Sequence, residues 1–290
     1  SADPGHATRG RRCYTGCMPT KCYRRGTSTP VTPSPQVVAA LADELAGAPA
    51  VLSMSFGKDS LGAAIACRRA GIRLTYVHTY VIPPDESGRL MPLIEEDRRL
   101  VEHHLGCRVH MYPGHCIYAW INRGVYCPPE RLGVYEGARL PEPTHEQIWQ
   151  LILDDLGLPR TTPIIDGVRC ADSLPRRASM SMTGPDRTTR GVRRVSAVWD
   201  WLNREIYQAI AEEDIPLPPD YRLFGRSFDG IDTRFTGPLR EHRPDDYRHI
   251  TGWFPLCETD LVRHELLMGG LPPRKKINTH GCRIAEDGEY

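Results

Sequence analysis

The sequence predicts an α/β protein built around a parallel sheet. Short apolar runs alternate with helical segments over the first half of the chain, in the order strand, helix, strand, helix, strand. This order favours a parallel sheet covered by helices. The apolar runs are continuous, which is typical of strands that are buried on both faces. The predicted strands cover residues 50–54, 73–81, 108–112 and 163–168.

Apolar residues at helical spacing predict helices between and after these strands. Gly71 and Gly106 follow two of the predicted helices and are typical of helix ends. We expect irregular structure over residues 113–143 and 224–252, which are rich in glycine and other loop-forming residues. The predicted helices cover about residues 37–45, 60–70, 91–105, 145–156, 195–213 and 258–268.

The composition is that of an ordinary globular protein. The chain has 290 residues, and its 37 Lys and Arg against 36 Asp and Glu give a net charge of +1, so no overall positive field points to nucleic acid. We see no apolar run of membrane-spanning length and no secretory leader, and therefore expect a cytoplasmic protein that does not act on membranes. In that compartment the 10 cysteines are expected to stay reduced.

The segment after the first predicted strand has the features of an anion site. We call residues 55–60 the phosphate loop: Ser55, Phe56, Gly57, Lys58, Asp59 and Ser60. A helix that begins directly after a strand offers unpaired backbone amides and the positive end of its dipole. Gly57 permits close approach of a phosphate, Lys58 adds charge, and Asp59 can cap the helix or help to hold Mg²⁺.

This loop resembles the SGGxDS-type loop of the PP-loop ATP-pyrophosphatase superfamily, with Phe56 in place of one glycine. The similarity is greatest to the phosphoadenosine phosphosulfate (PAPS) reductase-like proteins. It implies the three-layer, Rossmann-like fold of the adenine nucleotide alpha-hydrolase-like proteins and a site for ATP or PAPS. His78 and Thr79 fall where that family contacts adenine, although His78 also fits a satisfied core histidine. The resemblance covers motifs within residues 51–221.

A second segment supports this resemblance. The predicted strand at 163–168 leads into Gly167 and Arg169, and Arg176 and Arg177 follow. The pattern is similar to the family's G-x-R-x-x-E-S segment, with Asp172 where Glu is usual. We expect the three arginines to converge on phosphate or sulfate oxygens through paired hydrogen bonds, the alternative being a surface cluster without a ligand.

Two chemistries follow from the resemblance. In one, an acceptor is adenylated and pyrophosphate leaves, with Lys58, Asp59 and Arg169 as catalytic residues. In the other, a thiolate reduces a sulfonucleotide and a thioredoxin-like partner resolves the product. Cys282 is the candidate thiolate, although the family's terminal E-C-G-L-H signature is absent. We favour adenylation. A nucleotide-binding component without turnover and a nucleic-acid sulfur-modifying enzyme remain open, as do the acceptor and the oligomeric state.

The arm at residues 1–35 carries a dense group of thiols. Cys13, Cys17 and Cys22 are predicted ligands of Zn²⁺ or an iron–sulfur cluster, with His6, Cys116, Cys127 or Cys282 as a fourth. The alternatives are free thiols and sulfur carriage. We therefore divide the chain into the arm, a nucleotide-binding domain at 36–222, and an irregular C-terminal extension at 223–290.

Overall fold

The computed structural model describes residues 22–271 and 277–289. Its centre is a six-stranded sheet in the order β3-β2-β1-β4-β6-β5. Every neighbouring pair is parallel except β5 and β6, which are antiparallel. The predicted α/β class with a parallel sheet is therefore confirmed. The strands are β1 Ala50–Ser53, β2 Leu74–Tyr80, β3 Val109–Pro113, β4 Ile164–Asp166, β5 Asp186–Thr189 and β6 Val192–Ser196.

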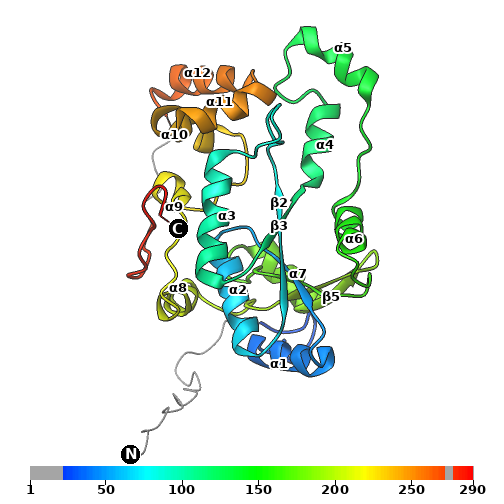
Figure 1. Ribbon diagram of the computed structural model, residues 1–290. Helices are drawn as coiled ribbons and strands as arrows, with labels where there is room; N and C mark the ends of the chain where they lie inside the picture. Colours follow the sequence, from blue (N-terminus) through cyan, green and yellow to red (C-terminus); the bar gives the residue numbers. More distant parts are fainter. Residues whose placement is uncertain (1–21, 272–276, 290) are drawn as a thin grey trace, which may run out of the picture.

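Helices cover both faces of the sheet and make three layers (Figure 1). Ala50 and Leu52 of β1 belong to the main hydrophobic cluster, which also takes apolar residues from one set of helices. Val51 faces the opposite side and packs in a second cluster with α6 (His145–Asp155). The helices that contribute to the main cluster include α1 Ser34–Leu45, α2 Lys58–Arg69, α3 Pro92–Leu105 and α8 Asn203–Glu212.

Helix α8 lies close against α2 because α2 has a glycine at the contact. A Cβ atom at Gly62 would lie only 2.6 Å from Cδ1 of Ile206. Arg69 at the end of α2 pairs with Glu213 at 2.7 Å and with Glu212 at 3.2 Å. These contacts hold α2, which follows the phosphate loop, against α8 from the second half of the chain.

The helix predicted over residues 195–213 is wrong in its first part. Residues 192–196 form β6, and helix α8 begins only at Asn203. The hairpin between β5 and β6 turns at Arg190 and Gly191, whose φ angles are +49° and +78°. Two consecutive residues at positive φ are typical of a two-residue hairpin turn. Apolar residues of the strand and of the following turn happen to continue the helical spacing of α8, which produced the error.

Two segments that we expected to be irregular contain helices. Residues 113–143 hold α4 and α5, and residues 224–252 hold α10 and nearly all of α11; α12 agrees with the helix predicted over residues 258–268. Pro129 and Pro244 stand in the first turns of α5 and α11, where proline is well tolerated. Phe235, Leu239 and Ile250 join the main hydrophobic cluster. The bounds of the remaining helices are α4 His115–Asn122, α5 Pro129–Ala138, α7 Leu174–Thr183, α9 Asp220–Phe224, α10 Thr233–His242, α11 Pro244–Trp253 and α12 Cys257–Met268.

Within the described residues, no helix has both the length and the apolar content needed to cross a bilayer.

Candidate functional site

The phosphate loop lies at the point where the strand order of the sheet reverses. β1 has β2 on one side and β4 on the other, so the chain leaves β1 at a switch point of the strand order. Ligands of open α/β sheets bind in the crevice outside the carboxyl ends of strands at such a point. The loop joins β1 directly to α2, and Gly57 is the residue before the first turn of that helix. The sequence-predicted order of strand, loop and helix is confirmed.

The loop is held in shape by its own serines. The Ser55 amide donates to Oγ of Ser60 at 3.2 Å, and the Ser60 hydroxyl donates to the Gly57 carbonyl oxygen at 2.8 Å. Ser55 is exposed. The amides of Asp59 and Ser60 belong to the first turn of α2, where a helix offers them no acceptor of its own. The Lys58 amide donates to the Tyr221 hydroxyl at 2.7 Å, so this amide of the first turn already has a hydrogen-bond acceptor.

A chain of alternating charges runs from the phosphate loop to α7. Nζ of Lys58 lies 2.7 Å from the Asp59 carboxylate, which in turn lies 2.8 Å from Nε of Arg169. Arg169 pairs with Asp172 at 2.7 Å, and Arg176 pairs with the same carboxylate at 2.6 Å. Burial lowers the pKa of Lys58, and the Asp59 carboxylate opposes that shift. The structure thus brings together four of the predicted residues, with Asp172 as the link between the arginines.

Gly167 lets the loop after β4 touch the start of α2. A Cβ atom there would lie 2.5 Å from the Asp59 carbonyl carbon and oxygen and 2.9 Å from the Ser60 nitrogen. Arg169 also donates to the Asn203 side chain at 2.9 Å and to the Trp201 carbonyl oxygen at 3.2 Å. The Arg169 side chain is only 3% exposed. It holds the loop after β4 against the start of α2, and its charge lies beside Asp59.

The other predicted ligand contacts lie further out. The Arg176 side chain is 50% exposed, and Arg177 is exposed on the first turns of α7. Thr79 is half-buried on β2 opposite Tyr112 of β3. We expected three arginines to converge on one ligand. In this structure Arg169 is buried, whereas Arg176 and Arg177 are exposed on α7.

Phe56 occupies a backbone conformation that glycine usually takes. Its φ angle is +59°, in the left-handed region, which costs an ordinary residue roughly 1–2 kcal/mol. The ring is buried and stacks on His78, with 4.3 Å between ring centroids. Burial lowers the pKa of His78 to about 4, and its Nδ1 lies 2.8 Å from the Met54 carbonyl oxygen. His78 is therefore a neutral histidine at pH 7 that supports the loop through Phe56.

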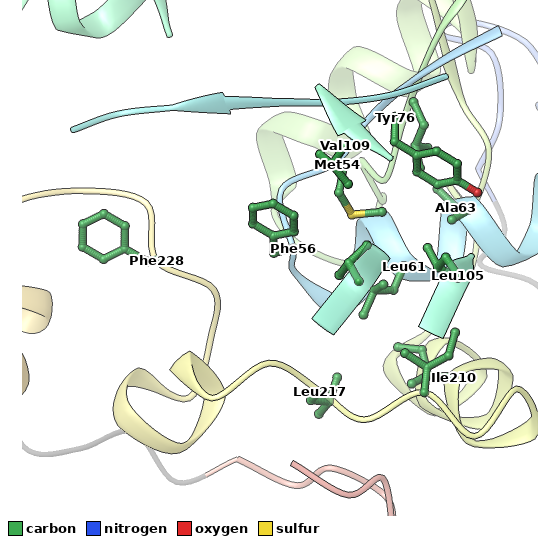
Figure 2. Packing of buried hydrophobic residues seen from close by; sticks show 14 of the residues in the cluster. Met54, Phe56, Leu61, Ala63, Tyr76, Leu105, Val109, Ile210, Leu217 and Phe228 are labelled. Atoms are coloured by element: carbon green, nitrogen blue, oxygen red, sulfur yellow. The ribbon is translucent and has the colours of Figure 1, made fainter. Parts of the chain in front are cut away.

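The segment 220–228 packs against the phosphate loop. Oγ of Ser227 is only 2.8 Å from the position of a Cβ atom at Gly57. Figure 2 shows Phe56 beside Met54 and Leu61, with Phe228 on the segment that follows α9. Ser227 and Asn203 were not predicted as site residues, because no local motif marks them. Ser227 meets Gly57 from a distant part of the sequence, and Asn203 meets Arg169 across 34 residues.

Two buried carboxyl groups interact where this segment begins: Asp97 of α3 and Asp220. Asp97 and Asp220 are 1% and 0% exposed. Both oxygens of Asp97 and Oδ1 of Asp220 lack a hydrogen-bond partner among the described residues. Oδ2 of Asp220 accepts the Phe228 amide at 2.7 Å. Burial raises the pKa of Asp97, and burial raises the pKa of Asp220 to about 7. Burial thus favours the protonated form of both carboxyl groups.

This pair makes stability fall with rising pH. Because the folded pKa of Asp220 lies above its unfolded value, its contribution to the free energy of unfolding decreases between about pH 4 and pH 7. Asp220→Asn supplies a neutral amide that donates to Asp97. We expect its Tm to exceed that of the wild type by roughly 5 °C at pH 8, with little difference at pH 4.5. Calorimetric scans at both values measure this; the control is Asp245→Asn, whose carboxylate is 71% exposed. An equal Tm difference at both pH values would contradict a titrating pair.

Cys282 is placed as a buried thiol. It is 7% exposed, and its Sγ donates to the Tyr207 carbonyl oxygen at 2.9 Å. Burial raises the pKa of the Cys282 thiol. In this structure it is therefore a neutral hydrogen-bond donor, whereas a nucleophilic role requires a thiolate.

The predicted metal ligands fall mostly outside the described residues. Cys13 and Cys17 lie there, while Cys22 is buried in a small cluster with Cys170 and Trp199. Among the residues that the structure describes, no three potential metal ligands come together.

Similarity to known proteins is found among solved structures. No protein-family model matches the sequence, and no curated protein does. Among solved structures, the chain is similar to the phosphoadenylyl-sulfate (PAPS) reductase from Candida auris in its phosphate complex, with a TM-score of 0.40 and 14% identity over 69% of this chain and 88% of that one. It is also similar to the NH3-dependent NAD synthetase from Campylobacter jejuni, with a TM-score of 0.38 and 15% identity over 84% of this chain and 97% of that one. Both likenesses are distant, so the residues of the site have to support any function.

Proposed function

We propose that this chain is a PAPS reductase-like PP-loop enzyme that binds the phosphate groups of an adenine nucleotide at residues 55–60. One observation carries the proposal. The start of α2, at a switch point of a parallel sheet, has Lys58, Asp59 and Arg169 in a continuous ion-paired chain. Positive side chains next to free helix amides are the physical requirements of a phosphate site.

The phosphate groups would replace contacts that the chain now makes with itself. A phosphate oxygen would take the place of the Tyr221 hydroxyl on the Lys58 amide. Nζ of Lys58 would turn from Asp59, to which it is ion-paired and hydrogen-bonded at 2.7 and 2.8 Å, to the ligand. Asp59 is 30% exposed and still paired with Arg169, and its carboxylate is the group that would hold Mg²⁺. The ion would neutralise phosphate charge.

The reaction that we propose is adenylation of an acceptor with release of pyrophosphate. Such chemistry depends on charge stabilisation and alignment rather than on a protein nucleophile. Lys58 would stabilise the departing pyrophosphate, and Arg169 would hold Asp59 in position from the loop after β4. The buried, hydrogen-bonded thiol of Cys282 gives the alternative, sulfonucleotide reduction, no thiolate in this conformation.

A nucleotide panel with product identification tests the proposal. The full chain is incubated with ATP and Mg²⁺, or with PAPS and a small thiol, and the products are separated by chromatography. We expect ATP to bind and, with water taking the adenylyl group when no acceptor is supplied, to yield pyrophosphate and AMP at a rate that Cys282→Ser leaves unchanged. Sulfite and adenosine bisphosphate from PAPS, lost in Cys282→Ser, would establish the reductase instead. Binding without any product would leave a nucleotide-binding component, and failure of both nucleotides to bind would remove the nucleotide site.

A further inference from the structure

Two arginines lie directly opposite each other on the last two strands of the sheet. Arg187 of β5 and Arg194 of β6 are partners in the antiparallel ladder, so their side chains leave the sheet on the same face. We call them the arginine pair. Their side chains are only 19% and 14% exposed. Like charges that face each other across a ladder are destabilising, and burial adds to the cost, so this pair needs negative charge nearby.

One buried carboxylate supplies part of that charge. Oδ2 of Asp166, at the end of β4, lies 3.2 Å from Arg187 and 3.9 Å from Arg194. Oδ1 of Asp166 accepts the Ser196 hydroxyl at 2.7 Å and the Val168 amide at 3.2 Å. Both oxygens of this carboxylate therefore have partners, and the longer contact leaves Arg194 the less well paired of the two arginines.

The second polar partner of Arg194 is a histidine that is neutral at pH 7. Nη2 of Arg194 lies 3.0 Å from Nδ1 of His145, and burial, with Arg194 nearby, lowers the pKa of His145 to about 4. On the other side of the ring, Nε1 of Trp149 donates to Nε2 of His145 at 3.3 Å. A neutral imidazole has one N–H and one acceptor nitrogen, so it satisfies only one of these two donors. Donors thus outnumber acceptors at this place.

The charges around the arginine pair leave one positive charge in excess. Arg190, at the hairpin turn, lies 3.7 Å from Glu146, so these two charges balance each other. Among the described residues, Asp166 is the only carboxylate that forms an ion pair with either member of the arginine pair. The ring of His115 lies 5.0 Å from that of His145, between centroids, and adds no negative charge. Two guanidinium groups therefore share one carboxylate.

We propose that Arg187, Arg194 and His145 form a binding site for the carboxylate group of a small organic acid. The single negative charge of such a group would balance the excess positive charge, whereas a phosphate dianion would exceed it. Its two oxygens would accept the hydrogen bonds for which acceptors are missing, in the paired geometry that arginine forms with carboxylates. His115 and His145 are exposed, so the site borders on solvent.

The site is separate from the phosphate loop but close to it in the sequence of contacts. Asp166 precedes Gly167, which touches backbone atoms at the start of α2. The arginine pair lies on the face of the sheet that α6 covers, since the Arg194 guanidinium lies 5.6 Å from the ring centre of Trp149. The carboxylate site can be measured in the absence of any nucleotide, so this proposal and the proposed function can fail separately.

Titration of the full wild-type chain with sodium acetate tests the site. Histidine rings are labelled with ¹³C and followed by NMR at pH 7, with sodium chloride keeping the ionic strength constant. The resonances of His145 and His264 are those that disappear in His145→Gln and His264→Gln. We expect the His145 resonance to shift and to saturate at millimolar acetate, because so small a ligand binds weakly. His264, on α12, should not respond.

Arg187→Gln and Arg194→Gln should each weaken acetate binding roughly tenfold, because each removes a charge-assisted hydrogen-bond donor. Arg193→Gln is the matched control and should keep the wild-type affinity. Arg193 precedes Arg194 on β6 but pairs with Glu44 and Asp186. The wild-type titration does not depend on the stability of these variants.

Three results would overturn the proposal. The first is a wild-type His145 resonance that does not respond to acetate. The second is an acetate response of unchanged affinity in folded Arg187→Gln and Arg194→Gln. The third is tighter binding of inorganic phosphate than of acetate at the same resonance, which would assign the site to phosphate groups instead of carboxylates.

Discussion

Lys58→Ala is expected to lower kcat/KM for nucleotide turnover by about 10²–10³-fold. A single donor that meets developing charge is typically worth that much in a preorganised site. Among the described residues, Lys58 is the only lysine that forms an ion pair at the loop. The Lys58 side chain is 15% exposed. The Asp59 carboxylate keeps Arg169 as a partner, so we expect the fold to survive. Initial rates with the nucleotide that the panel identifies measure the effect.

The matched control is Arg89→Ala. This arginine is also paired with an aspartate, Asp85, but its side chain is 81% exposed and lies outside the loop. We expect rates within about a factor of two of the wild type, because exposed ion pairs contribute little. A Lys58→Ala variant as active as this control would remove the loop from the mechanism.

Gly167→Ala is expected to damage both stability and nucleotide binding. The new Cβ atom would lie 2.5 Å from backbone atoms of Asp59, which cannot rotate away as a side chain can. Overpacking of this kind costs roughly 3 kcal/mol, or a fall in Tm of roughly 6–12 °C. Because the atoms that must move carry the first turn of α2, affinity for the nucleotide should fall as well. Calorimetric scans and nucleotide titrations measure the two effects.

Gly137→Ala provides the control for this substitution. Gly137 lies in α5 at ordinary helical φ, and a Cβ atom there meets nothing within 4 Å. Alanine is the better helix former, so this change should raise stability by up to about 1 kcal/mol and leave binding unchanged. A Gly167→Ala variant that behaves like Gly137→Ala would show that the loop after β4 does not press on the start of α2.

The sequence predicted the parts of the fold that depend on local periodicity. The apolar run of β1, the glycine turn and the first turn of α2 are consecutive, so their pattern is readable from residues 50–69 alone. The β5–β6 hairpin was missed because its strands are short and rich in arginine, and its turn has no Asn-Gly or Asp-Gly pair. Helices α10 and α11 were missed because glycine and proline interrupt their apolar spacing, whereas α12 agrees with the helix predicted over residues 258–268.

The residues of the site were predictable only where a local sequence motif marks them. Lys58, Asp59 and Arg169 stand in recognisable motifs, and the structure joins them. The bond from the Lys58 amide to Tyr221 spans 163 residues, and the contact of Cys22 with Cys170 depends on how the N-terminal segment packs. Tertiary packing sets such contacts, and no spacing in the sequence encodes them.

Hydrogen exchange of the wild-type chain, with and without ATP and Mg²⁺, tests the central claim most directly. If phosphate groups bind at the start of α2, saturating nucleotide should slow amide exchange in peptides that cover residues 55–61 and 219–228. Peptides from the exposed helix α12 should not change. Unaltered exchange across residues 55–61 in the presence of bound nucleotide would contradict the claim, because the ligand would then bind elsewhere.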